Sequence, residues 1–340
     1  MKTLAVKYRP TDWIDVVEQD NIKIILQQQI ETQSIKNAYL FCGPAGDGKT
    51  TTARIFASKI NKGEGAPIEL DAASNNSVDD MRGIIAQAKT KSLDSEYKIF
   101  IIDECHMISN AGWNAMLKLI EEPPAKSIFL FATTNPEKIP KTILSRVQRF
   151  DFHRISQEGI YDRLQYIAQS ENIKVTNQAL DYISKISNGG MRDAITALDK
   201  CTSFTEYIDL KSVVDILGVA DYDTMFKLTD ALIDSKIQDA LDIINGLFNA
   251  GKELKQFIRQ YIDFVVDVEK YLCGCDWDYL QIPLLDSYKS WLSSCGNYEY
   301  TVCKRILDRM LELNANIKWS TSPKFDIEAE LFLMCEDKSE

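Results

Sequence analysis

The sequence predicts an α/β fold with a parallel sheet, followed by a small helical domain and an all-α domain. Apolar runs with strand character alternate with helical patterns over residues 1–155, as in sheets whose strands are joined by helical crossovers. A glycine-rich segment lies directly between the first strand and the helix after it. From Ser156 onward the strand pattern largely disappears. We therefore expect domains at residues 1–155, 156–220 and 221–340.

Each expected element follows from the local pattern. The expected strands are Ala38–Phe41, Ile68–Asp71, Lys98–Asp103, Ser127–Thr133 and Val147–Phe152. The expected helices between them are Gln19–Gln33, Thr51–Asn61, Val78–Thr90 and Ala111–Glu121. The second domain shows short helical stretches near residues 157–170, 177–187, 191–204 and 209–217. In the third domain, a helix at Tyr298–Leu313 places Val302, Ile306, Met310 and Leu313 on one face, which is typical of a helical bundle.

The glycine-rich segment predicts a phosphate-binding loop. Residues 43–50 read G-P-A-G-D-G-K-T and fit the pattern G-x-x-x-x-G-K-[ST] at every required position. The backbone N–H groups of such a loop and the N-terminus of the next helix bind phosphate, Lys49 reaches the β- and γ-phosphates, and Thr50 holds Mg²⁺. The alternative is a glycine-rich turn with a chance lysine. The candidate nucleotide contacts here are Gly43, Pro44, Ala45, Gly46, Asp47, Gly48, Lys49, Thr50 and Thr51.

Two further strands end in polar residues. The strand Lys98–Asp103 is apolar in its middle and ends in Asp103 and Glu104, with Asp103 54 residues after Lys49. At the carboxyl edge of a parallel sheet, Asp103 can hold Mg²⁺ and Glu104 can orient the attacking water. The strand Ser127–Thr133 is followed by Thr134, which can contact the γ-phosphate or that water. The alternatives are a strand leaving the core for a polar loop and ordinary turn chemistry.

Composition and charge exclude several protein classes. The 340 residues are 45% hydrophobic and 26% charged, as in globular domains, and no apolar run is long enough to span a membrane. The N-terminus lacks the apolar core of a signal peptide. The net charge of −11 resides in residues 201–340, which carry 14 basic and 25 acidic side chains. Residues 1–150 carry 19 basic and 18 acidic side chains, so a surface on this part of the chain can still bind a phosphate backbone.

The eight cysteines predict a reduced protein without zinc. They include no C-x-x-C pair, and Cys273 and Cys275 form a C-x-C without a matching second pair. Cys42, Cys105, Cys303 and Cys335 lie within apolar runs and are expected to be core thiols. A cytoplasmic location follows from this pattern.

The ordered motifs resemble those of the AAA+ clamp loaders, most closely the gamma/tau subunit type of the bacterial DNA polymerase III clamp loader. The resemblance covers about residues 4–220. Beyond the loop it rests on the segments Lys7-Tyr8-Arg9-Pro10, Val16-Val17, Asn37 to Phe41, Asp71 to Ser74, Val78 to Arg82, Ile102 to Met107, Asn114 to Lys118, Leu119 to Pro124, Ala132-Thr133-Thr134, Ile143 to Arg146 and Met191 to Ala194. Residues 221–340 resemble the family only in their helical character and placement.

The resemblance implies an AAA+ P-loop NTPase domain, a helical lid and a helical collar that mediates oligomerisation. It implies that Thr134 is a first nucleotide sensor and that Arg192, on the lid, is a second. It implies that Arg146 acts in trans on ATP held by the neighbouring subunit, and that Tyr8, Arg9, Pro10 and Val17 line the adenine pocket. The residues expected to act in catalysis are Lys49, Asp103, Glu104, Thr134, Arg146 and Arg192.

The partners are likewise implied by the resemblance. They are a sliding clamp, primer–template DNA, and other subunits of a hetero-oligomer, expected to be a pentamer with several copies of this chain. ATP and Mg²⁺ are the implied cofactors. Helix N-termini would contact the DNA backbone. The candidate DNA contacts are Ser74, Asn75, Asn76, Ser77, Arg82, Ser109 and Asn110. Plain helix capping is the alternative role of these serines and asparagines, and the two roles are compatible.

The sequence departs from the family pattern in several places. The gap before the second strand is too short for the cysteine-rich zinc module. Glu18 stands where glycine is usual, Asn37 where histidine is common, and Asp47 puts a carboxylate on the phosphate loop. That carboxylate must point away from the phosphates or be offset by cations. The long C-terminal extension of the tau form is not present in the sequence, so a phage or a divergent bacterium is a plausible source.

The leading expectation is an ATP-driven clamp-loader motor subunit that opens a sliding clamp and loads it on primed DNA during replication. Two alternatives remain open at this point. One is another AAA+ motor on DNA, for branch migration or helicase loading. The other is a scaffold subunit that binds nucleotide without turnover.

Overall fold

The computed structural model describes residues 3–217, 222–282, 286–295 and 300–336. The chain divides into two compact units. One comprises Met1–Lys174 with Ile183–Ser203, and the other comprises Val175–Tyr182 with Phe204–Glu340. The two units are those within which residues contact one another most densely. The three domains expected from the sequence stay a prediction.

The first unit is built on a five-stranded parallel sheet, as predicted. Its strands are β1 (Ala38–Cys42), β2 (Ile68–Asp71), β3 (Lys98–Asp103), β4 (Ser127–Thr133) and β5 (Gln148–Asp151). All five were predicted, with ends that differ by one residue at most. The strand order is β2-β3-β4-β1-β5, so β4 lies between the strand that precedes the phosphate loop and the strand that ends in the acidic pair.

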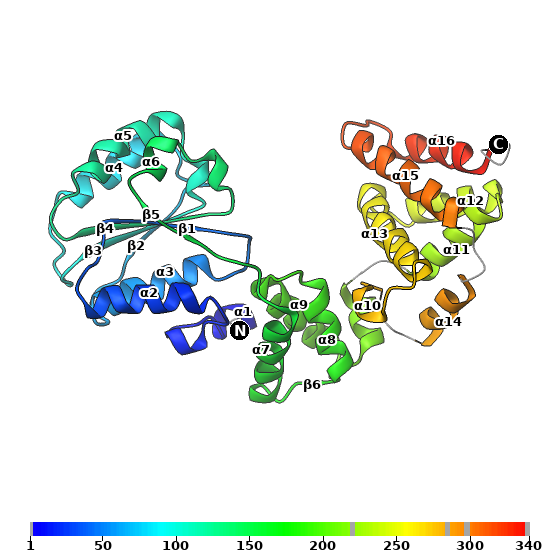
Figure 1. The fold of residues 1–340 in the computed structure, drawn as a ribbon, viewed down its shortest axis with the longest axis horizontal. Coiled ribbons are helices and arrows are strands. Elements are labelled where there is room, and N and C mark those ends of the chain that lie inside the picture. The colour runs from blue at the N-terminus through cyan, green and yellow to red at the C-terminus, as the bar shows by residue number, and fades with distance from the viewer. Residues whose placement is uncertain (1–2, 218–221, 283–285, 296–299, 337–340) are drawn as a thin grey trace. The chain divides into compact units, whose positions relative to one another are not determined.

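Helices cover both faces of this sheet (Figure 1). One face carries α2 (Asp20–Glu31) and α3 (Lys49–Ile60), and the other carries α4 (Val78–Ala88), α5 (Asn110–Glu121) and α6 (Lys141–Leu144). Successive side chains of a strand point to opposite faces. Tyr39 and Phe41 of β1 therefore pack with Phe56 of α3, whereas Leu40 belongs to the core that contains Trp113 of α5. The central strands β1, β3 and β4 are buried along most of their length, so polar residues emerge where these strands end, at the carboxyl edge of the sheet.

The remaining elements are helical apart from one small sheet. In the first unit and across its boundary lie α1 (Leu4–Lys7), η1 (Trp13–Asp15), η2 (Cys105–Met107), η3 (Pro136–Lys138), α7 (Gln157–Ser170), α8 (Asn177–Ile186) and α9 (Met191–Phe204). The second unit contains α10 (Leu210–Leu217), α11 (Tyr222–Ile233), α12 (Ile237–Asn249), α13 (Leu254–Leu272), η4 (Trp277–Tyr279), α14 (Asp286–Ser294), α15 (Tyr300–Ile317) and α16 (Pro323–Glu336).

Sequence reasoning missed one small feature and misplaced one core position. A two-stranded sheet pairs β6 (Lys174–Val175) with β7 (Tyr207–Ile208), and two-residue strands are too short to show an alternating pattern. On α15, Ile306, Met310 and Leu313 are buried as predicted. Val302 is only partly buried, because Cys303 takes that core position.

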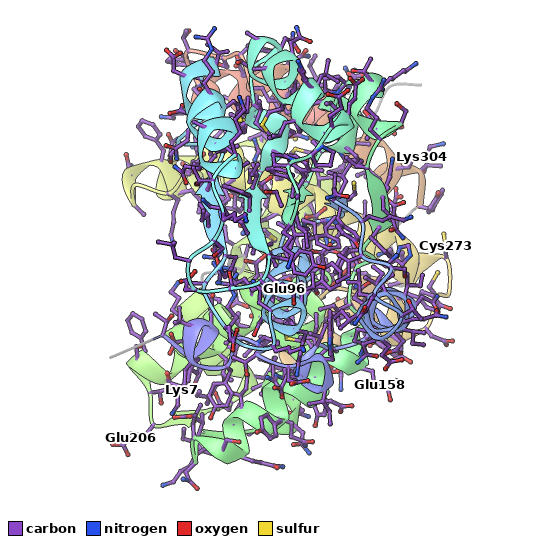
Figure 2. All side chains as sticks on the ribbon, turned by 90° about the vertical axis from the view of Figure 1, so that its left-hand side faces the viewer. Lys7, Glu96, Glu158, Glu206, Cys273 and Lys304 are labelled. Carbon is purple, nitrogen blue, oxygen red and sulfur yellow. The ribbon has the colours of Figure 1, made fainter. Side chains whose placement is uncertain are left out.

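The cysteines largely follow the prediction. Cys42, Cys105 and Cys303 are buried, whereas Cys335 is only partly buried because it lies at the end of α16. Cys273 and Cys275 are exposed, and Cys273 is labelled at the surface in Figure 2. Within the described ranges, no group of three or more His, Cys, Asp and Glu side chains is arranged to hold a metal ion. No helix in these ranges is long and apolar enough to cross a membrane.

Candidate nucleotide-binding site

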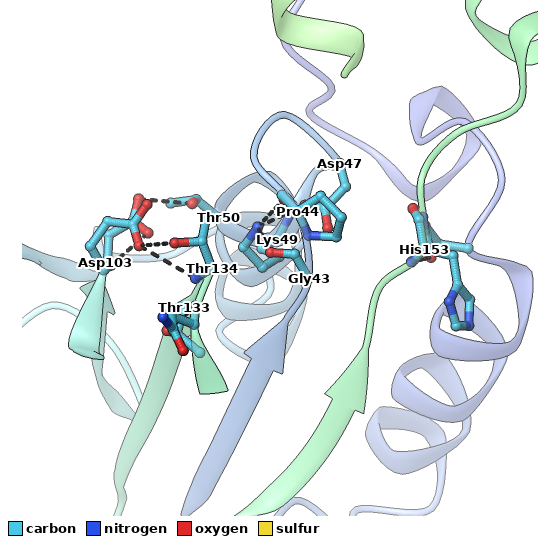
Figure 3. Close-up of polar contacts among 12 residues, drawn as sticks. Gly43, Pro44, Asp47, Lys49, Thr50, Asp103, Thr133, Thr134 and His153 are labelled. Carbon is cyan, nitrogen blue, oxygen red and sulfur yellow. Dashed lines mark hydrogen bonds and ion pairs between the residues drawn. The ribbon is translucent and has the colours of Figure 1, made fainter. Parts of the chain in front are cut away.

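The phosphate loop connects β1 to α3 and closes around the side chain of Lys49 (Figure 3). Gly46 and Gly48 have φ angles of 79° and 98°, a region that favours glycine. The Lys49 ammonium donates to the carbonyl oxygens of Gly43, at 2.8 Å, and Pro44. It also forms an ion pair with Asp47, with 3.0 Å between Nζ and Oδ1. The carboxylate on the loop is thus buried and offset by a cation within the loop itself.

Gly43 allows this close packing because it has no side chain. A Cβ atom there would lie 2.3 Å from Asp47 Oδ2 and 2.7 Å from the Phe152 carbonyl oxygen. We expect Gly43→Ala to lower the free energy of unfolding by about 1–3 kcal/mol through overpacking, and to weaken nucleotide binding. Thermal unfolding and nucleotide titration measure both effects.

Gly83→Ala is the matched control for that variant. Gly83 lies in α4, and a Cβ there has no neighbour within 4 Å. The control is expected to keep nucleotide affinity and to gain up to about 1 kcal/mol of stability, because alanine favours a helix over glycine. Equal behaviour of the two variants would contradict the packing argument.

Thr50 and Asp103 meet at the carboxyl edge of the sheet. The Thr50 hydroxyl donates to Asp103 Oδ2 at 2.8 Å, so residues 53 positions apart in the chain become neighbours. A hydroxyl and a carboxylate are hard oxygen ligands of the kind that Mg²⁺ prefers. The donor set therefore fits the cation that the sequence predicts at these two residues.

Glu104 is held by two neighbours. Its φ angle of 46° lies in the left-handed region, which is uncommon for a residue with a side chain and frequent at functional sites. Oε2 of Glu104 accepts a hydrogen bond from the Thr134 hydroxyl at 3.0 Å and lies 3.2 Å from Nδ1 of His106. His106 Nδ1 is also 3.1 Å from the Thr133 hydroxyl. His106 belongs to a motif segment, but sequence reasoning gave it no role.

One cavity of about 480 Å³ in the first unit joins these residues, a size suited to a small-molecule ligand. The residues with predicted roles that line it are Tyr8, Arg9, Pro10, Val17, Ala45, Gly46, Asp47, Gly48, Lys49, Thr50, Thr51, Asp103, Glu104, Thr134 and Arg192. Gly43 and Pro44 are not among its lining residues and contribute through their contacts with Lys49. The cavity therefore joins the residues predicted to bind phosphate with those predicted to bind adenine.

The N-terminus of α9 packs directly on the phosphate loop. The Met191 N–H donates to the Gly46 carbonyl oxygen at 3.1 Å. A Cβ on Gly46 would lie only 3.1 Å from Gly190 Cα, so the approach depends on two glycines. This contact brings Arg192 to the cavity wall, and its role as a second sensor stays a prediction.

Residues of α7 and α9 that no sequence pattern indicated also line the cavity. Arg163 donates to the Tyr8 carbonyl oxygen at 3.2 Å and stacks over Tyr166. Asp199 accepts from the Leu4 N–H at 3.2 Å. Burial lowers the pKa of Arg9, whose guanidinium donates to the Thr51 hydroxyl. These contacts connect the N-terminal segment with the two helices.

Glu18, which stands where the family usually has glycine, adopts a backbone conformation that favours glycine. Its φ angle is 56°, which costs a residue with a side chain some backbone strain. In return, Oε1 of Glu18 accepts hydrogen bonds from the backbone N–H and the hydroxyl of Ser156, the N-cap of α7. The departure from the family pattern therefore adds a link between the turn after Val17 and α7.

Arg146 lies outside the cavity of its own chain. Its guanidinium donates to the Thr142 carbonyl oxygen at 2.7 Å and forms an ion pair with Glu121 at 2.8 Å. The side chain is 38% exposed. Of the predicted catalytic residues, Arg146 alone is not brought to this cavity, and its action on another subunit stays a prediction.

The candidate DNA contacts lie at or near the N-termini of two helices, α4 and α5. The Ser109 N–H donates to the Asn76 carbonyl oxygen at 3.2 Å, so the N-termini of α4 and α5 are adjacent. Ser77 caps α4 in a capping box with Asp80, and Ser109 caps α5. Arg82 is exposed and pairs with Asp79. The capping role is thus present, and the DNA role stays a prediction.

Comparisons with known proteins identify the family. Three family models match successive parts of the chain: "DNA polymerase III, delta subunit" over residues 66–156, "DNA polymerase III clamp loader subunit, ATPase lid domain" over 159–206, and "DNA polymerase III subunits gamma and tau domain III" over 208–274. The DNA polymerase III subunit tau of Bacillus subtilis is 34% identical in an alignment that covers 97% of this chain. These matches support a gamma/tau-type clamp-loader ATPase subunit.

The curated relatives of this gamma/tau-type subunit differ in length. The chain spans 62% of the Bacillus subtilis protein and 52% of the gamma/tau subunit of Mycoplasma genitalium. The DNA polymerase III subunit gamma of Buchnera aphidicola is 28% identical in an alignment that covers 96% of this chain and 97% of that protein.

Solved structures confirm the AAA+ fold. The Thermotoga maritima RuvB Holliday junction branch migration motor matches with a TM-score of 0.53. The match has 19% sequence identity and covers 72% of the gamma/tau-type chain and 86% of RuvB. At this identity the likeness concerns the fold alone.

Proposed function

We propose that the chain is an ATP-driven motor subunit of a clamp loader, which opens a sliding clamp and loads it on primer–template DNA. The observation that carries the proposal is a single cavity joining the phosphate loop, the Thr50–Asp103 pair, Glu104 with Thr134, and Arg192 from the lid. The matched clamp-loader model and the DNA polymerase III relatives support the context of clamp and DNA.

The chemistry proposed for the cavity is hydrolysis of the γ-phosphate of ATP. Lys49 and the loop N–H groups bind the phosphates, and Thr50 and Asp103 hold Mg²⁺. Bound Mg²⁺ neutralises negative charge on the phosphates. Glu104 orients the attacking water and accepts its proton, and Thr134 holds the carboxylate of Glu104 in place. Arg192 contacts the phosphates when the lid is closed.

Arg146 is proposed to complete the site of a neighbouring subunit. A guanidinium supplied across an interface stabilises the charge that develops on the transferred phosphoryl group. Because it is available only when subunits dock, hydrolysis depends on assembly. The exposed position of Arg146, outside its own cavity, supports this role. The hetero-oligomer, with several copies of this chain, and the DNA contact at the N-termini of α4 and α5 are parts of the same proposal.

The test is ATP hydrolysis by the complete complex assembled with its partner subunits. We expect at least about a tenfold higher rate of phosphate release when the clamp and primed DNA are both present, because both must bind before the sites are complete. The clamp alone and duplex DNA without a primer end serve as controls. A complete complex that clamp and primed DNA fail to stimulate would contradict the proposal, and a closed hexamer would favour a branch-migration type of motor.

A further inference from the structure

The carboxylate of Asp47 is an unusual component of the phosphate loop. Its side chain is 1% exposed, and Oδ1 lies 3.0 Å from the Lys49 ammonium. Oδ2 is buried and has no hydrogen-bond partner among the described residues. Buried carboxylate oxygens are normally hydrogen-bonded, so an unpartnered one calls for a physical explanation. Oδ1 also accepts from the backbone N–H of Lys49, the first residue of α3, at 3.4 Å, but this contact leaves Oδ2 unexplained.

Asp47 takes up part of the bonding capacity of Lys49. A lysine ammonium has three donors and no acceptor. In this structure the acceptors around Nζ of Lys49 are the carbonyl oxygens of Gly43 and Pro44 and Oδ1 of Asp47 (Figure 3). All three donors are therefore engaged within the loop. A phosphate that binds Lys49 must displace one of these acceptors or share a proton with it, and Asp47 is the only charged one among the three.

The charge of Asp47 also opposes a bound nucleotide. The negatively charged carboxylate and phosphates repel each other, and the repulsion is stronger in a buried site than in water. Burial raises the pKa of Asp47 although the adjacent Lys49 acts to lower it, so the desolvation of the carboxylate is the larger influence. The carboxylate is 1% exposed and packs against Gly43, where an added Cβ would lie 2.3 Å from Oδ2, so it has little room to turn away from the loop.

We propose that Asp47 is an affinity-determining residue of the nucleotide site, which competes with the β- and γ-phosphates for Lys49 and so weakens the binding of ATP and ADP. The inference rests on the proposed nucleotide-binding function. It assigns to this chain a built-in reduction of affinity that a neutral side chain at the same position does not provide.

The test compares the full chain with its Asp47→Asn variant, which keeps the size of the side chain and removes the charge. Dissociation constants are measured for ATP, ADP and AMP. We expect ATP and ADP to bind about tenfold more tightly, while the affinity for AMP is unchanged, because AMP has no β- or γ-phosphate for Lys49. A general loosening of the loop would change all three affinities together, and that result would overturn the proposal.

Asp151→Asn is the matched control. Asp151 lies at the end of β5 in the same unit, is 55% exposed in its side chain and pairs with Arg149 rather than Lys49. The Asp151→Asn variant also loses one negative charge, and its nucleotide affinities are expected to equal those of the unaltered chain. Thermal unfolding verifies that each variant is folded, and Asp47→Ser replaces Asp47→Asn if the latter is not.

The outcomes separate the inference from the proposed function. ATP binding by the unaltered chain, without a gain in the folded variant, overturns the inference alone. Undetectable ATP binding by both proteins overturns the inference and the proposed function together. Tighter ATP and ADP binding with unchanged AMP binding supports both.

Discussion

Lys49→Ala is expected to weaken ATP binding by the isolated chain by about 100-fold or more. The lysine is predicted to bind two phosphates, and each charge-assisted hydrogen bond contributes about 1.5–3 kcal/mol to the binding free energy. A change of about 1.4 kcal/mol corresponds to a tenfold change in affinity. Hydrolysis by the assembled complex is expected to fall below detection, because the site no longer fills with ATP and because Lys49 no longer stabilises the charge on the phosphates. Titration with a fluorescent ATP analogue measures the first effect, and phosphate release measures the second.

The structure adds a consequence for stability. Without Lys49, the buried carboxylate of Asp47 loses its ion pair, and an unpaired buried charge is strongly destabilising. The double variant Lys49→Ala with Asp47→Asn is therefore expected to unfold at a higher temperature than Lys49→Ala alone, while its ATP binding stays as weak as that of Lys49→Ala. This separates loss of the site from loss of the fold.

Lys59→Ala is the matched control on the same helix. Lys59 lies at the opposite end of α3, is 40% exposed and pairs with Asp12 outside the cavity. ATP binding by this variant is expected to be unchanged. Near-normal ATP affinity in folded Lys49→Ala would show that the loop does not bind phosphate as proposed.

Arg146→Ala is expected to have no effect on ATP binding by the isolated chain and a large effect on turnover in the assembly. Arg146 does not line its own cavity, so its removal leaves the predicted nucleotide contacts intact. An arginine supplied in trans is worth about 10³–10⁵-fold in the rate of phosphoryl transfer. We expect stimulated hydrolysis by the complex to fall by at least about 10³-fold if every copy carries the substitution.

Arg149→Ala provides the comparison for this variant. Arg149 lies three residues further along the chain, on the edge strand β5, and is 44% exposed in its ion pair with Asp151. It removes the same type of side chain from the same unit, and turnover is expected to be normal. If the fully assembled Arg146→Ala complex hydrolyses ATP at the normal rate, Arg146 does not act in trans.

Much of the site was predictable because its parts are local in sequence. The phosphate loop is one continuous segment, and its glycines, Lys49 and Thr50 carry their own signal. The acidic pair was predictable from an apolar strand that ends in Asp103 and Glu104. All five strands were predicted to within one residue. The central strands β1, β3 and β4 carry the clearest signal, because side chains buried on both faces of a parallel sheet leave long apolar runs. The two-residue strands β6 and β7 carry no such signal.

Contacts between distant segments were not predictable in the same way. No local pattern indicates that Arg163 and Asp199 line the cavity, because their roles depend on where α7 and α9 pack. The sequence did raise the question of the Asp47 carboxylate. Its burial against Lys49, and the unpartnered oxygen that remains, emerged only from the folded loop. Likewise, Glu18 was visible as a departure, but its bond to Ser156 was not.

By itself, the sequence determined which segments form the sheet and which residue types stand at its carboxyl edge, because periodicity and loop chemistry are local properties. The tertiary structure decided which of those residues meet. The strand order places β4 between β1 and β3, so that Thr134 contacts Glu104 beside the phosphate loop. It also decided that Arg192 reaches the cavity and that Arg146 does not. Strand order and helix packing depend on the burial of the whole core, which no single segment encodes.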